Sequence, residues 1–206
     1  MRTSIGLAAM ACCALSAVSS SAQTEVPNPA DPYVQDQTGM QFPAKIANSV
    51  RHQVTRYAED GSDTGIGYQV IKDGKMIAYV SMFFYPAPAI DSAGDGARAK
   101  ACKSVFAGIE GDVRSHDPNT KLVSEQDVPA PFPIFRAKGL RATFAGGSLS
   151  FDGKKQAVHD EAYLYCYAGG QWLVAYRATW PETYDASKEV NALIGAVAWS
   201  EKLARP

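Results

Sequence analysis

The sequence predicts an α+β domain: an antiparallel β-sheet of about six to seven strands sandwiched by an internal helix and a C-terminal helix. Three observations predict it. An Asp-Gly turn separates two apolar segments, two other segments repeat apolar residues at helical spacing, and three strand-like segments follow one another late in the chain. The 206 residues contain no internal repeat and suit a single domain.

The clearest strand signal is a hairpin. Residues 67–71 and 76–85 are mainly apolar, and Asp73-Gly74 lies between them. Asp-Gly tolerates the positive backbone angles of a two-residue hairpin turn. Residues 76–85 are apolar on both faces, which predicts a central strand that is covered from two sides. The alternation within residues 49–57 predicts a strand before this hairpin.

Two segments have the apolar period of a helix. The first, within residues 95–115, places its apolar side chains at i, i+3, i+4, i+7 and i+11. These side chains are Cys102, Val105, Phe106, Ile109 and Val113. The second, residues 187–203, carries a stripe of Val190, Leu193, Ile194 and Val197. Both stripes need an apolar partner, which a sheet between the two helices supplies.

Four strand candidates lie between the helices. Residues 121–128 form the first, and a proline-rich break follows. The next three cover a segment from Phe135 towards Phe144 and on to Phe151, then residues 156–167, then residues 172–179. Asp152-Gly153 and Gly169-Gly170 supply turns, so these three strands are predicted to form an antiparallel meander.

This succession of strand, hairpin, helix, strand, meander and helix resembles the PsbP-like α/β/α sandwich over most of residues 42–203. The likeness is an order of elements and contains no diagnostic motif. Proteins of that fold act mainly as accessory or assembly factors, so the resemblance implies a binding role more than catalysis. Fold alone does not assign function.

The N-terminus has the pattern of a secretory signal peptide over residues 1–22. Arg2 provides the positive charge, residues 5–18 are uncharged, and Ser20 and Ala22 occupy the −3 and −1 positions of a cleavage site. We therefore expect cleavage near Ala22 and a periplasmic or secreted protein without a transmembrane segment. Residues 23–41, which contain three prolines, are predicted to be a flexible tether, and residues 42–206 a single α+β domain.

Composition restricts the possible partners. Lys and Arg number 20 against 21 for Asp and Glu, giving a formal net charge of −1. A nucleic-acid-binding protein normally has a basic excess, so no nucleic acid is expected. A protein partner or small ligand in the cell envelope is the expected kind of partner, and no cofactor is expected.

The cysteines indicate a disulfide. Cys12 and Cys13 fall within the predicted signal peptide, which leaves Cys102 and Cys166 in the exported chain. Cys102 lies on the apolar stripe of the internal helix, and Cys166 lies on the strand face opposite Tyr163, Tyr165 and Tyr167. Both can point into one helix-to-sheet layer, and an oxidising compartment favours their pairing. Two separate buried thiols are the alternative.

An aromatic row is the candidate ligand-binding surface. It comprises Tyr163, Tyr165, Tyr167, Trp172 and Tyr176. Tyrosine and tryptophan combine a large apolar body with a polar group, which suits a ligand groove or an interface. The alternative is that these side chains pack beneath the C-terminal helix as core.

The sequence contains no nucleophile elbow, phosphate-binding loop, dinucleotide fingerprint or His-Glu-x-x-His motif. The favoured hypothesis is therefore a non-enzymatic binding or accessory module of the envelope. The alternative is an exported metal-assisted enzyme that uses His159 and Glu161, which share a strand face, together with a distant His52.

Overall fold

The computed structural model describes residues 23–90, 94–131, 138–151 and 153–204. Strands account for 51% of these residues and helices for 20%, so the protein is mainly β. The strands are β1 (Thr24–Glu25), β2 (Tyr33–Gln35), β3 (Met40–Phe42), β4 (Lys45–Ile46), β5 (Ser49–Arg56), β6 (Thr64–Lys72), β7 (Lys75–Pro86), β8 (Lys121–Pro129), β9 (Lys138–Phe151), β10 (Lys154–Ala168) and β11 (Trp172–Pro181). The helices are α1 (Asp95–Ser115), α2 (Ser187–Ala196) and α3 (Glu201–Ala204).

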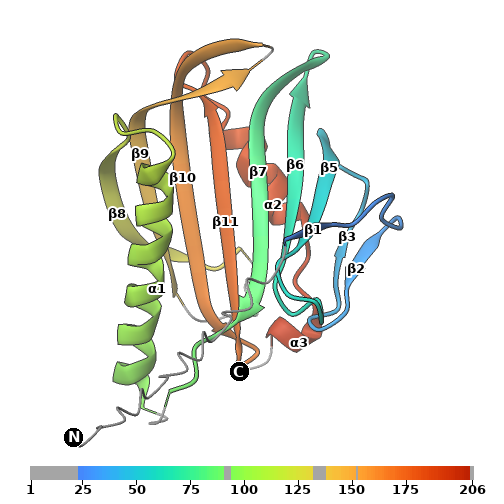
Figure 1. Cartoon of the computed structure of the whole chain (residues 1–206), viewed down its shortest axis with the longest axis vertical. Coiled ribbons are helices and arrows are strands. Elements are labelled where there is room, and N and C mark those ends of the chain that lie inside the picture. Colours follow the sequence, from blue (N-terminus) through green and yellow to red (C-terminus); the bar gives the residue numbers. More distant parts are fainter. Residues whose placement is uncertain (1–22, 91–93, 132–137, 152, 205–206) are drawn as a thin grey trace, which may run out of the picture.

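One large sheet dominates the structure (Figure 1). Its nine strands follow the order β1-β5-β6-β7-β11-β10-β9-β8, with β4 also paired to β5. Every pairing is antiparallel. A separate two-stranded sheet joins β2 to β3. The predicted hairpin is confirmed as β6 and β7, with Asp73 and Gly74 both at positive φ in the turn.

The predicted fold class is wrong. The sheet has nine strands, where about six to seven were expected, and the structure is not a sandwich of such a sheet between helices. The two additional strands, β1 and β4, are two residues long and both pair with β5. A strand of two residues has no alternation to detect, so only its pairing with a neighbour defines it.

The segment predicted as a flexible tether differs from that expectation. Residues 23–41 contain β1, β2 and the start of β3, and Tyr33 and Met40 are buried in the main core. The buried Gln35 amide donates to the Gly61 carbonyl at 2.8 Å, which ties this segment to the loop before β6. Short strands, buried side chains and this hydrogen bond therefore attach the segment to the rest of the domain. The predicted signal peptide lies outside the described residues.

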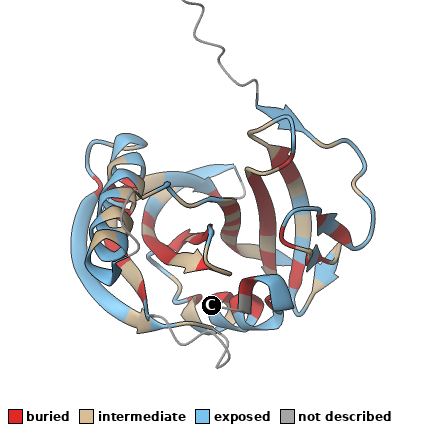
Figure 2. Ribbon diagram, turned by 90° about the horizontal axis from the view of Figure 1, so that it is seen from below, coloured by how far each residue is buried: buried red, intermediate tan, exposed pale blue. Residues whose placement is uncertain are grey.

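The pairing of β7 with β11 separates two cores. Its register places Phe84 opposite Val174 and Phe83 opposite Ala175. Even-numbered residues of both strands face the core beneath α2, and odd-numbered residues face the core beneath α1. Figure 2 shows exposed residues on the outer sides of the helices and buried residues towards the sheet.

The helices are confirmed in part. The internal helix spans the predicted residues, and its stripe packs on the sheet through buried Phe106 and Val113. The C-terminal helix is interrupted: α2 ends at Ala196, and α3 begins only at Glu201. Within that break, the indole of Trp199 donates to the Tyr176 hydroxyl at 2.7 Å in the main core. Among the described residues, no helix has the length and apolar character needed to cross a membrane.

The Cys102–Cys166 disulfide is confirmed. Its Cα atoms lie 5.9 Å apart, and it joins α1 to β10 within the smaller core. Cys102 and Cys166 are both half-buried. The bond closes a loop with a sequence separation of 64 residues, so it restricts the unfolded chain strongly.

Replacing both cysteines, as in the double variant Cys102→Ala/Cys166→Ala, is expected to lower the free energy of unfolding by about 4 kcal/mol, the loop-closure value for a loop of this size. Urea unfolding of the oxidised protein and of the variant measures this difference. Reduction of the wild-type protein should reproduce it and should leave the variant unchanged. Equal stability of all three samples would contradict the prediction.

Candidate functional site

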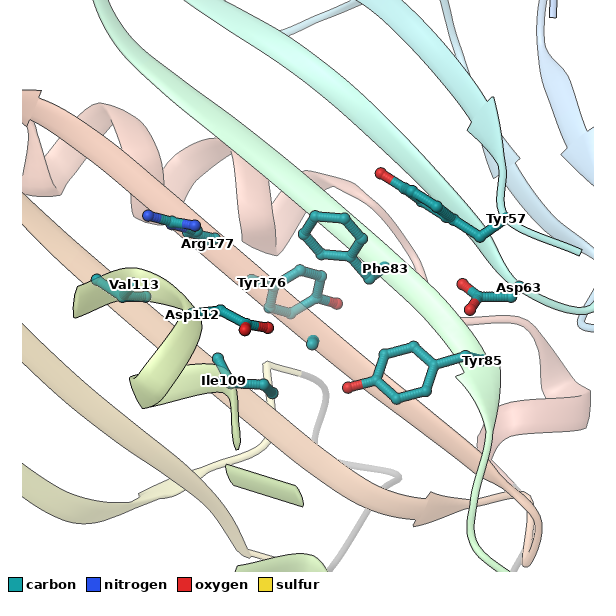
Figure 3. A pocket seen from close by; sticks show the side chains of 10 residues that line it. Tyr57, Asp63, Phe83, Tyr85, Ile109, Asp112, Val113, Tyr176 and Arg177 are labelled. Atoms are coloured by element: carbon teal, nitrogen blue, oxygen red, sulfur yellow. The ribbon is translucent and has the colours of Figure 1, made fainter. Parts of the chain in front are cut away.

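An open cavity lies where α1 meets the centre of the sheet (Figure 3). We name it the aromatic cleft; its volume is about 340 Å³. Its walls are mainly apolar and come from four parts of the chain. The lining residues are Tyr57, Asp63, Phe83, Tyr85, Ile109, Asp112, Val113, Ala175, Tyr176 and Arg177. Tyr57, Phe83 and Tyr85 are half-buried, as expected for rings that line an open cavity.

Strand alternation builds the floor of the cleft. Phe83 and Tyr85 are two residues apart on β7, so both point to the face that α1 partly covers. Tyr57 follows β5 on the same side, and its ring centroid lies 6.3 Å from that of Phe83. Gly65 on β6 makes this approach possible: a Cβ there would lie 3.0 Å from the Tyr57 ring and 3.1 Å from the Phe83 ring.

Three charged side chains complete the lining. Burial raises the pKa of the Asp63 carboxyl group, and no other effect shifts that pKa. Burial lowers the pKa of Arg177, although Asp160 and Asp112 act in the opposite direction. Burial, followed by the negative charges of Asp63 and Asp112, raises the pKa of Tyr85 to about 12. The cleft therefore combines aromatic rings, partly buried charged side chains and an open cavity.

A second polar site lies on the opposite face of the sheet. We name it the Glu161 cluster: Arg141, His159, Glu161 and Tyr163. The buried Glu161 carboxylate forms an ion pair with Arg141, accepts the Tyr163 hydroxyl and lies 3.2 Å from His159 Nε2. Burial acts to raise the pKa of this carboxyl group, but the hydrogen bonds outweigh it, and the pKa is lowered.

The Glu161 cluster borders a cavity of about 490 Å³, into which Trp180 and Tyr184 also project. The His159 ring stacks on Trp180 with centroids 4.5 Å apart. Because Glu161 already binds three side chains of its own chain, its carboxylate has little capacity left for a ligand. The cluster is best explained as a structural network between β9, β10 and β11. The aromatic cleft is therefore the stronger functional candidate.

The predicted aromatic row is divided by the structure. Tyr163, Tyr165, Trp172 and Tyr176 are buried in the main core beneath α2 and α3. Tyr167 is half-buried beside a bulge in β10, has a φ of 57° and lies below the Arg98 guanidinium. Tyr176 borders the aromatic cleft and Trp172 borders another cavity, although both side chains are buried in the main core. Ligand binding by the row stays a prediction.

The three residues of the metal hypothesis do not meet. His159 and Glu161 are adjacent, but His52 lies on β5, four strands away from β10 in the sheet order. At about 4.8 Å per strand, that is roughly 19 Å along the sheet. The His52 ring lies over Gly67, on the other face. Within residues 23–90, 94–131, 138–151 and 153–204, no three His, Cys, Asp or Glu side chains form a metal-binding group.

Comparison of the sequence with known protein families and with curated proteins finds no match. The resemblance to the PsbP-like sandwich therefore stays a prediction.

The residues of the aromatic cleft were not predicted as a site from the sequence. Phe83 and Tyr85 were assigned to a covered central strand, and Tyr57 to a strand end. A signal was present in Gly65-Ile66-Gly67, because two glycines on one face of a strand leave room for the rings of neighbouring strands. Asp63 and Arg177 had no detectable signal, since their positions depend on turn geometry and on register.

The substitution Glu161→Gln is expected to lower the free energy of unfolding at pH 7 by about 3 kcal/mol, because it leaves Arg141 without its buried partner. The lowered pKa sets the pH dependence. The stabilisation is complete above the unfolded pKa of about 4.3 and is lost as the pH falls through the folded value.

Urea unfolding between pH 7 and pH 2 tests this expectation. The difference between the wild-type protein and Glu161→Gln should shrink as the pH falls below about 4.3. The exposed Glu59→Gln should match the wild type throughout. A difference that is independent of pH would refute the proposed role of the carboxylate charge.

Proposed function

We propose that this protein is an exported, non-enzymatic binding module of the cell envelope and that its ligand is a small molecule held in the aromatic cleft. One observation carries the proposal: a mainly apolar cavity of about 340 Å³ that contains a few convergent polar groups. Small-molecule sites typically have volumes of about 300–1,000 Å³ and this type of lining. The cleft lies at the edge of the smaller core, and the half-buried rings of Tyr57, Phe83 and Tyr85 line it.

Export is proposed from the sequence of residues 1–22. The charged start, the uncharged run and the small residues at 20 and 22 support a cleaved signal peptide. The Cys102–Cys166 bond is consistent with this proposal, because disulfides persist mainly in oxidising compartments. The binding role agrees with the absence of recognisable catalytic motifs in the sequence.

N-terminal sequencing of the protein from the envelope fraction of cells that express the full chain tests export. The expected first residue is Gln23. The substitution Ala22→Arg should block processing, because the −1 position requires a small residue. Recovery of an uncleaved chain in the cytoplasmic fraction would refute export.

A tryptophan at position 109 tests binding in the cleft. Ile109 lines the cleft from α1, so Ile109→Trp should fill it, whereas Ala107→Trp adds the same side chain on the exposed face of that helix. We expect the neutral apolar dye Nile red to bind the wild type and Ala107→Trp equally. Ile109→Trp should weaken its binding by at least about tenfold, or about 1.4 kcal/mol.

Fluorescence titration measures the three affinities on protein purified from cells that express the full chain. Far-UV circular dichroism of each variant checks that the fold is retained. Equal dye affinity for Ile109→Trp and Ala107→Trp would overturn the assignment of the ligand site to the cleft.

A further inference from the structure

Three aromatic rings surround one end of the aromatic cleft. Figure 3 shows Tyr57 and Tyr85 on either side of the Asp63 carboxylate, with Phe83 beside them. The Tyr57 and Phe83 rings are inclined at 42° to each other, so they form two walls of a corner. Ring faces carry partial negative charge and attract cations that lie within about 6 Å of the ring centre.

Two carboxylates add negative charge to the cleft, with Asp63 at the aromatic end and Asp112 on the α1 side. Asp63 comes from the turn before β6 and Asp112 from α1, so two separate elements direct acidic groups at one cavity. Burial and then the charge of Asp63 raise the pKa of Tyr57, and Tyr85 is affected by both carboxylates. Asp63 is therefore close enough to both hydroxyl groups to act on them electrostatically, although burial has the larger effect.

Arg177 does not cancel this potential. Figure 3 places its guanidinium at the other end of the cleft from Asp63. The nearby negative charges that act on it are those of Asp160 and Asp112. In the described part of the chain, Asp63 takes part in no ion pair, and no cationic side chain shifts its pKa. Asp63 therefore lacks a counter-charge.

We propose that the aromatic end of the cleft binds an organic cation, specifically a substituted ammonium group held among Tyr57, Phe83 and Tyr85 and neutralised by Asp63. This inference rests on the proposed function and specifies its ligand class. A substituted ammonium keeps apolar surface on its carbon atoms, so it gains from the rings as well as from the charge. An anionic group entering this end would meet the Asp63 carboxylate.

The chemistry of the site also separates an organic cation from a metal ion. The carboxylates of Asp63 and Asp112 are not part of any metal-binding group formed by the described residues. The rings supply no oxygen ligands besides two hydroxyls, whereas calcium takes six to eight oxygens. A large, weakly hydrated cation needs no such coordination shell.

A pair of isosteric esters tests the proposal. Acetylcholine carries a trimethylammonium group, and 3,3-dimethylbutyl acetate replaces its nitrogen with carbon and is neutral. Both are titrated at pH 7 as competitors of Nile red, with the protein from cells that express the full chain. Acetylcholine should bind at least about fivefold more tightly than the neutral ester, within the range of cation–π attraction.

Two variants assign the preference to the site. Asp63→Asn keeps the size of the side chain and removes its charge, so the preference for acetylcholine should fall to about twofold or less, while the affinity for the neutral ester stays unchanged. Glu59→Gln removes an exposed charge nearby that does not line the cleft, and it should retain the full preference. The same loss in both variants would show a long-range charge effect and would overturn the role of Asp63.

The outcomes distinguish the two proposals. Equal or tighter binding of the neutral ester overturns the cation site and leaves a ligand-binding cleft in place. Failure of acetylcholine to displace the dye from the wild type also overturns it. If Ile109→Trp does not weaken dye binding, the cleft is not the ligand site. The proposed cation site is then refuted as well.

Discussion

The structure depends on the antiparallel pairing of β7 with β11. This pairing joins the strands before α1 to the meander that follows β8, and every residue of the nine-stranded sheet is placed relative to it. Because side chains alternate along a strand, the register of the β7–β11 pairing also determines which residues face each helix. A shift by one residue would exchange the two sets, moving Met82 towards α1 and burying Phe83 beneath α2. The cleft exists because Phe83 and Tyr85 are on the face that α1 covers incompletely.

The disulfide and the packing of α1 determine how much of this sheet face α1 covers. Cys102 holds α1 to β10, and the cleft residues Ile109 and Val113 follow it by two to three helical turns, roughly 10–16 Å along the axis. Phe106 and Val113 are buried between helix and sheet, so the later turns cannot pivot freely about the bond. One wall of the cleft is thus set by a covalent link and a packed stripe. The facing wall is set by strand register.

The sequence predicted the regular elements that have a long period. The hairpin at Asp73-Gly74, the helix from Asp95 to Ser115 and the long meander strands were found because each repeats its pattern over many residues. The strands at Thr24–Glu25 and Lys45–Ile46 were missed because β5, distant from the first of them in sequence, supplies their hydrogen bonds. The pairing of Cys102 with Cys166 could be predicted because the apolar face of a helix and one face of a strand carry these two residues. The cleft could not be predicted in this way, because the loop that carries Tyr57 and Asp63 and the strand that carries Arg177 come to one cavity only through the pairing of β6, β7 and β11.

The carboxylates of Glu161 and Asp63 have different surroundings. Glu161 is surrounded by donors from its own chain, and their hydrogen bonds outweigh the effect of burial. Asp63 is half-buried among rings, and burial alone acts on it. Placing a carboxylate in apolar surroundings without a donor lowers stability, and any neighbouring strand could have carried a lysine or arginine to relieve it. The Glu161 cluster shows that this sheet accommodates such a partner. The proposed organic cation would supply, from outside the chain, the counter-charge that Asp63 lacks.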